Sequence, residues 1–175
     1  EQNTPEQLRR HPKGAVPVLV DGDVTIFESG AICAYLSDKF PEKNLAPKAD
    51  DLQRAYYYQW MFYAAATIDP AAVDLFVQRK LRDDNERNLS KIADAKVAYH
   101  EAARHIEKTL SDRDYLLGKK FSTADLMLGC AFMWNEDQLD IYPAITHWLN
   151  RLRERPAFLR SAEKNMSWDT GQQVR

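Results

Sequence analysis

The sequence predicts a mainly helical α/β chain, in which a short β-hairpin and one helix precede an all-helical domain. An Asp-Gly pair, Asp21-Gly22, separates two apolar, β-branched runs within residues 16–27, and this is the strongest short-range signal for a hairpin. Beyond residue 50 the apolar residues recur every three or four positions, which is the period of a helix. The stretch between these two regions, residues 42–49, contains Pro47 and indicates a linker.

The composition indicates a globular protein without a strongly charged partner. The chain has 175 residues, with 24 Lys and Arg against 26 Asp and Glu, and a formal net charge of −2. This near balance argues against nucleic acid or an anionic membrane surface as the main partner. The longest apolar runs, such as Trp60–Ala66 and Leu126–Trp134, fall far short of the roughly 20 residues that span a bilayer. We therefore expect a soluble chain that buries a real core.

The two cysteines, Cys33 and Cys130, favour a reducing compartment. They lie far apart, form no Cys-x-x-Cys motif, and the chain starts without the features of a signal peptide. Both fall within apolar helical patterns, so we expect buried free thiols rather than reactive ones. We therefore expect a cytoplasmic protein.

The first forty residues predict a loop, the hairpin and a helix, in that order. Residues 1–12 are polar and contain two prolines, which indicates a loop with one helical turn. The second strand of the hairpin leads directly into Ser29, which we expect to cap the following helix. Apolar residues recur at helical spacing from Ile32 to Phe40, and Pro41 ends the helix by restricting the residue before it.

Glu28 and Ser29 form a corner suited to the head group of an amino acid. The free backbone N–H groups, the Ser29 hydroxyl and the positive end of the helix suit a carboxylate, while the Glu28 side chain suits an ammonium group. A purely structural interpretation stays open, because Ser often caps helices and Glu often ends strands. Pro17 favours the ligand interpretation, because a proline inside a strand pattern needs an edge, a bulge or a cis turn.

The rest of the chain predicts a series of packed helices. Residues 52–68 indicate a helix that is apolar most of the way round, and Asp69-Pro70 is expected to bend or interrupt it. A polar stretch, residues 82–88, precedes a helix whose apolar stripe runs to Leu110. Pro143 and Pro156 each mark the first turn of a further helix.

The sharpest helix start in the chain is Phe121-Ser122-Thr123-Ala124-Asp125-Leu126. Ser122 can cap the helix, Asp125 can return a hydrogen bond, and Phe121 can form a hydrophobic staple with Leu126. The residues up to Trp134 are almost wholly apolar, and Gly129 permits a close helix contact. We therefore expect a central, buried helix here.

These features together resemble the cytosolic glutathione transferase superfamily, of the bacterial or theta-like type. The resemblance rests on the order and spacing of the segment 13–19 (Lys-Gly-Ala-Val-Pro-Val-Leu), the Glu28-Ser29 pair and the helix that follows. It implies that Pro17 is a cis-proline and that the Val16 backbone pairs with the cysteinyl peptide of glutathione. Glu28 and Ser29 would then hold the γ-glutamyl end.

The resemblance also implies two further contact regions. Ala15 departs from the family, in which Gln or Lys at this position often contacts the glycyl end of glutathione, so Lys13 and His11 are the candidates for that contact. The hydrophobic pocket for the electrophile would be lined in part by the first long helix, where the candidates are Tyr57, Trp60 and Met61. Aromatic and Met residues at this spacing more often belong to a plain core.

By resemblance, the domains are a partial thioredoxin-like, glutathione-binding domain (1–41), a linker (42–49), an all-helical bundle domain (50–166) and a C-terminal tail (167–175). In the family a β-α-β unit of about 30 residues or more precedes the hairpin. We therefore expect the sequence to be a fragment, or the ordered part, of a longer polypeptide. The residue that lowers the pKa of the glutathione thiol, a Ser, Tyr or Cys, is expected upstream of Glu1, so the catalytic residue is unknown in this chain.

The implied function is a transferase that conjugates or transforms electrophilic small molecules with the glutathione thiol, as in detoxification. The alternative is a non-catalytic glutathione-binding or protein-interaction module, because one scaffold supports several functions. Glutathione is the expected co-substrate and a homodimer the expected assembly, with no nucleic-acid or membrane partner. No metal is expected, because the four histidines lack the spacing of a metal site (His11, His100, His105 and His147).

Overall fold

The structure is a computed structural model that describes residues 4–169, with side-chain surroundings described up to residue 163. The order of its elements agrees with the predicted architecture of a hairpin, a helix, a linker and a helical domain. In chain order they are α1 (Pro5–Arg10), β1 (Val18–Asp21), β2 (Val24–Phe27), α2 (Ser29–Lys39), η1 (Pro41–Lys43), α3 (Gln53–Tyr63), η2 (Ala64–Ile68), α4 (Asp69–Phe76), η3 (Val77–Leu81), η4 (Asp84–Glu86), α5 (Leu89–Leu110), α6 (Thr123–Met133), η5 (Glu136–Gln138), α7 (Pro143–Arg153) and α8 (Pro156–Asp169).

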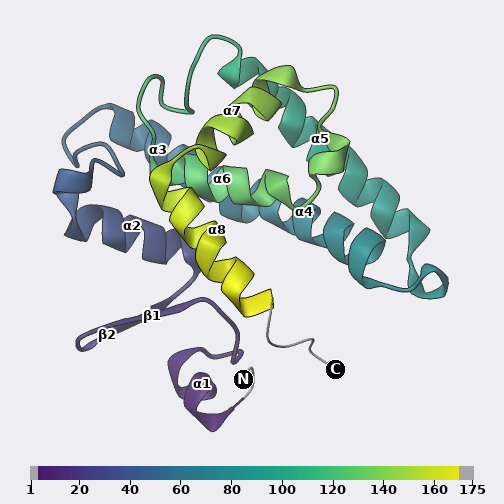
Figure 1. Ribbon diagram of the computed structural model, residues 1–175, viewed down its shortest axis with the longest axis horizontal. Helices are drawn as coiled ribbons and strands as arrows, with labels where there is room; N and C mark the ends of the chain where they lie inside the picture. Colours follow the sequence, from purple (N-terminus) through teal and green to yellow (C-terminus); the bar gives the residue numbers. More distant parts are fainter. Residues whose placement is uncertain (1–3, 170–175) are drawn as a thin grey trace.

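The N-terminal part of the chain is a small α/β unit on one side of the helical domain (Figure 1). Strands β1 and β2 pair antiparallel, with Asp21 opposite Val24, so the turn consists of Gly22 and Asp23. This is one residue later than the Asp21-Gly22 turn that the sequence predicts, because Gly22 takes the first turn position with a φ of 59°. Asp21 fixes the hairpin to α2, since it accepts a hydrogen bond from the Tyr35 hydroxyl at 2.9 Å and forms an ion pair with Lys39.

One predicted helix cap is wrong. Helix α2 begins at Ser29 itself, and its N-cap residue is Glu28, which has a φ of 73° and a ψ of 119°. The Glu28 carbonyl accepts the first helical hydrogen bond, from the Ile32 N–H at 2.9 Å, and no side chain caps this end. The chain leaves β2 through the positive-φ turn at Glu28, and this moves the cap one residue toward the N-terminus.

Helix α6 is the centre of the helical domain, as the sequence predicts. It contacts α2, α3, α4 and α7, and α8 crosses in front of it in Figure 1. The core around it contains the fully buried side chains of Tyr57, Tyr99, Phe132 and Trp148. The close contact expected at Gly129 is present, because a Cβ atom there would lie 2.5 Å from Leu152 Cδ1.

The bend or interruption predicted at Asp69-Pro70 is a π-helical turn inside a continuous helix. The elements α3, η2, α4 and η3 form one helical stretch, Gln53–Leu81, and η2 lies directly before Asp69. A π-turn and a proline are each known causes of irregularity in a helix. By length and composition alone this stretch could cross a membrane, but Ile68 and Leu75 are fully buried among the other helices. One face of this stretch therefore belongs to the core, while 33% of its most apolar window is buried in all.

The C-terminal tail begins later than the sequence predicts. The tail, residues 167–175, overlaps α8 up to Asp169, and residues 170–175 lie outside the described part of the chain.

Cys33 is half-buried, but Cys130 is exposed, so the expected burial of Cys130 is wrong. It lies on the face of α6 that lines an apolar cavity shared with α8. Partial burial raises the pKa of both thiols, which disfavours the reactive thiolate.

Candidate functional site

The strongest candidate site is the corner where the segment before β1 faces the start of α2. The peptide bond between Val16 and Pro17 is cis, as the resemblance implies. Val16 precedes the β-ladder, which begins at Val18, and its side chain is 67% exposed. Its backbone is therefore placed at an open edge, where an extended peptide can pair with it.

The start of α2 offers unpaired donors beside a carboxylate. The first helical bond uses the Ile32 N–H, so the N–H groups of Ser29, Gly30 and Ala31 have no partner within the helix. Both Glu28 and Ser29 are exposed. The helix dipole favours an anion at these amides, and the Glu28 carboxylate favours a cation next to it.

Backbone strain marks the same corner. Glu28 is a non-glycine residue with a positive φ outside the ordinary left-handed region. Such conformations cost about 1–3 kcal/mol and concentrate at ligand sites, where the surroundings hold them in place. Gly30 forms the apolar base of the corner, because a Cβ atom there would lie 3.9 Å from Met127 Cε and 4.0 Å from Met61 Cε.

His11 and Lys13, the candidates for the glycyl end, lie in the loop before Val16. His11 is only 8% exposed, and its ring centroid is 4.8 Å from that of Phe27. Its Nδ1 accepts a hydrogen bond from the Lys13 N–H at 3.0 Å, so a neutral ring carries its proton on Nε2. The Lys13 side chain is exposed. The Gln7 side chain donates to the Ala15 carbonyl at 2.6 Å and fixes this loop against α1.

The three candidates for the hydrophobic pocket all lie in the core of the helical domain. Tyr57 is fully buried, and Trp60 and Met61 are 5% and 6% exposed. The Tyr57 hydroxyl lies 2.8 Å from Thr123 Oγ1. This burial agrees with the core interpretation, although the edge of Trp60 also lines a cavity of about 460 Å³ together with His105. A role of the three residues in binding the electrophile stays a prediction.

The capping box at the start of α6 is present. Asp125 Oδ2 accepts hydrogen bonds from the Ser122 N–H at 2.9 Å and from the Ser122 hydroxyl at 3.0 Å. Asp125 Oδ1 accepts from Leu116 N–H at 2.8 Å and from Trp148 Nε1 at 3.1 Å. Burial raises the pKa of the Asp125 carboxyl, and these hydrogen bonds oppose the shift. The two staple residues, Phe121 and Leu126, line one apolar cavity.

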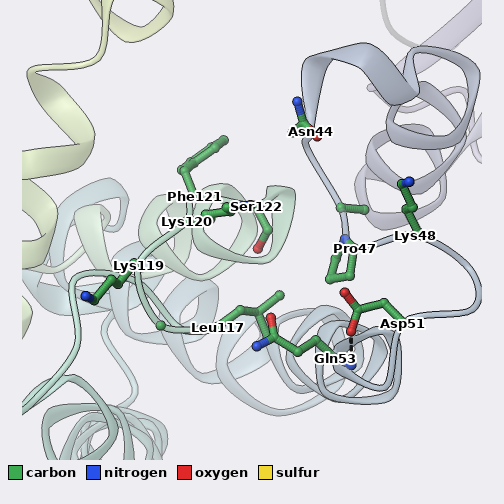
Figure 2. Close-up of a pocket in the computed structure, with 12 residues that line it drawn as sticks. Asn44, Pro47, Lys48, Asp51, Gln53, Leu117, Lys119, Lys120, Phe121 and Ser122 are labelled. Atoms are coloured by element: carbon green, nitrogen blue, oxygen red, sulfur yellow. Dashed lines mark hydrogen bonds between the residues drawn. The ribbon is translucent and has the colours of Figure 1, made fainter.

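Further cavities in the described part of the chain also lie away from the corner. One, of about 560 Å³, separates the linker from the loop before α6 (Figure 2). Lys48 and Lys119 lie on opposite sides of it, and Lys119 points away from Asp51 and Gln53, so its charged groups do not converge on one ligand (Figure 2). Another cavity, of about 340 Å³, is apolar and lies between α6 and α8. Sequence reasoning missed these two cavities, because their walls combine segments distant in the chain.

No metal centre accompanies the corner within residues 4–169, since no three His, Cys, Asp or Glu side chains gather there to hold an ion. The charged groups at the corner are suited to a zwitterionic organic ligand instead. The pairing of Val18 with Phe27 places Val16-Pro17 and Glu28-Ser29 at the same end of the hairpin, and the His11 ring packs on Phe27. Tyr57, Trp60 and Met61 lie in the core of the helical domain.

Comparisons with known proteins give the family of this chain. The glutathione S-transferase N-terminal domain matches residues 1–38, and the C-terminal domain matches residues 65–156. Glutathione S-transferase 1 of Dianthus caryophyllus is 39% identical over 73% of this chain and 58% of its own length. A zeta-class glutathione S-transferase of Euphorbia esula is 34% identical over 93% of this chain and 68% of its own.

A solved structure supports the same assignment. The sphingomonad glutathione S-transferase complexed with glutathione is 26% identical, with a TM-score of 0.79 over 90% of this chain and 77% of that one. The fold thus consists of part of a thioredoxin-like domain followed by a helical domain. The chain belongs to the glutathione S-transferase family.

Proposed function

We propose that this chain binds glutathione at the corner formed by Val16, Glu28 and Ser29, and that it works as a glutathione transferase on electrophilic small molecules. The observation that carries the proposal is the exposed Val16 edge at the hairpin, together with the uncapped start of α2 beside the Glu28 carboxylate. Family membership supports it, since a relative of the same fold is complexed with glutathione.

Each part of glutathione has a suitable partner at the corner. The Val16 backbone pairs with the cysteinyl peptide as an added strand would. The free N–H groups and the hydroxyl of Ser29 bind the γ-glutamyl carboxylate, and the Glu28 carboxylate binds the neighbouring ammonium group. His11 Nε2 and the Lys13 ammonium group are the candidate donors for the glycyl carboxylate.

The chemical step uses the glutathione thiol, whose pKa must fall for the thiolate to form. We assign this task to no residue of the chain, because by resemblance it belongs to a segment preceding the hairpin. The electrophile would bind in an apolar pocket for which Tyr57, Trp60 and Met61 remain candidates. We also propose that the protein is cytoplasmic and forms a homodimer. Light scattering tests the homodimer, which should have twice the mass of one chain.

Calorimetric titration with glutathione tests the site. Replacing Glu28→Ala together with Ser29→Ala should weaken binding by about 2–4 kcal/mol, or roughly 30- to 700-fold, because charge-assisted bonds are lost at both ends of the zwitterion. The pair Glu86→Ala and Ser90→Ala, both exposed and outside the corner, is the matched control. Unchanged affinity in the Glu28/Ser29 variant, with its fold intact, would show that the proposed binding site is wrong.

Turnover separates the transferase from a binding module on the same scaffold. A protein that binds glutathione and consumes it in the presence of an electrophile is a transferase. Binding of glutathione without any consumption, measured on a polypeptide that also contains the segment preceding the hairpin, would favour the non-catalytic module.

A further inference from the structure

Three buried hydroxyl groups connect α3, α6 and α2 in one row. The Tyr57 hydroxyl lies 2.8 Å from Thr123 Oγ1, and Thr123 Oγ1 lies 3.1 Å from Ser37 Oγ. Ser37 Oγ in turn donates to the Cys33 carbonyl, within α2, at 2.7 Å. The residues are 0%, 5% and 3% exposed in the order Tyr57, Thr123 and Ser37. The row is thus almost wholly buried, with Thr123 also at the edge of the apolar cavity between α6 and α8.

The number of hydroxyl protons fixes which group donates and which accepts at each step of the row. Each hydroxyl has one proton, and Ser37 uses its own on the Cys33 carbonyl. Thr123 must therefore donate its proton to the Ser37 oxygen. The lone pair of Thr123 Oγ1 is then free to accept the hydrogen bond from the Tyr57 hydroxyl. The other acceptor near the Thr123 hydroxyl, the Leu45 carbonyl, is at 3.5 Å, a long distance for a hydrogen bond. The relay runs from Tyr57 through Thr123 and Ser37 to the backbone of α2.

A second polar contact holds the same end of α2. Arg54 donates to both carboxylate oxygens of Asp38, at 2.8 and 3.0 Å, and to the Pro47 carbonyl at 2.8 Å. The Thr123 N–H holds the linker through the Leu45 carbonyl at 2.8 Å. Directional bonds therefore fix the C-terminal half of α2 to the helical domain.

The N-terminal end of α2, which carries the corner, is held differently. Around Gly30, in its first turn, the nearest atoms of the helical domain are the methyl groups of Met127 and Met61, about 4 Å from the position of a Cβ atom. Thioether side chains are flexible and make no directional bond. Ser37 lies eight residues beyond Ser29, about 12 Å along the helix at 1.5 Å per residue. The direction of α2, and with it the place of Ser29, thus depends on the polar contacts at its other end.

We propose that Thr123 is a positioning residue for the glutathione corner, acting through its hydrogen bond to Ser37 on α2. This inference rests on the proposed function. Thr123 is free for this task because Ser122 and Asp125 complete the capping box without it. Replacement by valine, which has the same shape, removes the hydroxyl and leaves the box intact.

Four variants separate positioning from stability. Glutathione binding is measured by calorimetry, and the free energy of unfolding by urea denaturation. Thr123→Val and Ser37→Ala both break the link to α2, so each should weaken binding about five-fold, the factor that corresponds to one hydrogen bond. Thr123→Ser keeps the hydroxyl and should restore wild-type affinity. Tyr57→Phe leaves the Thr123–Ser37 bond in place, so it should lower stability but keep affinity.

Two controls make the outcome specific. Thr109→Val removes a hydroxyl that bonds only within α5, to the His105 carbonyl, and it should bind glutathione as the wild type does. The double variant Thr123→Val with Ser37→Ala should bind no more weakly than either single variant, because both remove the same link.

The results distinguish the inference from the function on which it rests. If Glu28→Ala with Ser29→Ala abolishes binding while Thr123→Val and Ser37→Ala bind as the wild type, the positioning role is wrong and the corner stands. If the wild type itself binds no glutathione, both the positioning role of Thr123 and the proposed binding site are wrong. Should Thr123→Val fail to fold, Ser37→Ala alone decides, since it leaves the Thr123 hydroxyl to turn to the Leu45 carbonyl.

Discussion

Replacing Asp125 by alanine should be among the most damaging single changes to the stability of this chain. The carboxylate is fully buried and accepts four hydrogen bonds from three residues, Leu116, Ser122 and Trp148. These residues come from the loop before α6, the cap of α6 and the middle of α7. One side chain therefore joins the central helix to two other parts of the helical domain.

The magnitude follows from the donors that would be left behind. Leu116, Ser122 and Trp148 are each at most 2% exposed, so water cannot replace the carboxylate without rearrangement. An unsatisfied buried donor costs about 1–3 kcal/mol, and partial relaxation makes such costs less than additive. We expect Asp125→Ala to lose about 3–5 kcal/mol, or roughly 10 °C in Tm for a domain of this size. Asp125→Asn should lose about half of this free energy of unfolding, because its amide nitrogen would face the Ser122 N–H.

The assay is urea denaturation followed by far-UV circular dichroism, with Asp94→Ala as the control. Asp94 is an exposed carboxylate on α5, so its replacement should change the free energy of unfolding by less than about 0.5 kcal/mol. A loss below about 1 kcal/mol in Asp125→Ala would refute the reasoning, because it would mean that the buried donors find other partners at little cost.

Two further changes test the packing and the electrostatics. Gly129→Ala should lower the free energy of unfolding, measured by urea denaturation, by about 1–2 kcal/mol. The added Cβ atom would lie 2.5 Å from Leu152 Cδ1, and this clash outweighs the better helix propensity of alanine. Equal or greater stability would contradict this. Hydrogen bonds from Arg79, with Lys80 nearby, hold the pKa of the Asp137 carboxyl well below its ordinary value. Its contribution to stability is therefore present above the unfolded pKa of about 4 and is lost as the pH falls through the lowered pKa. In acid denaturation Asp137→Asn should reduce the slope of stability against pH below about 4, and an unchanged slope would contradict this.

Local signals predicted much of this fold, because their physical cause lies within a few residues. The capping box depends on Ser122 and Asp125 alone, and both of its hydrogen bonds are present. The end of α2 at Lys39 follows from the restriction that Pro41 places on Phe40. The hairpin likewise follows from one glycine between two β-branched runs, although the turn is shifted by one residue.

Other features depend on contacts that no local pattern contains. The start of α2 was misplaced because Ser29 has the right side chain for a cap, whereas the position of the cap is set by the positive-φ turn at Glu28. The exposure of Cys130 could not be predicted, because α6 is apolar on nearly all sides and its pattern does not distinguish the face toward α8. The corner itself was predicted from residues close in sequence, whereas its base, Met61 and Met127, comes from distant helices.

The start of α6 illustrates how one short segment divides local and long-range tasks. Ser122 and Asp125 satisfy the free donors of the helix end, so the sequence predicts their role correctly. Thr123 lies between them with a hydroxyl that the cap does not need, and its partners, Tyr57 and Ser37, are 66 and 86 residues away in sequence. Stability should therefore respond most to changes at Asp125, and glutathione affinity to changes at Thr123. If both properties changed in proportion at both positions, α6 would act only as a core helix, and the link from its first turn to the corner would have no separate role.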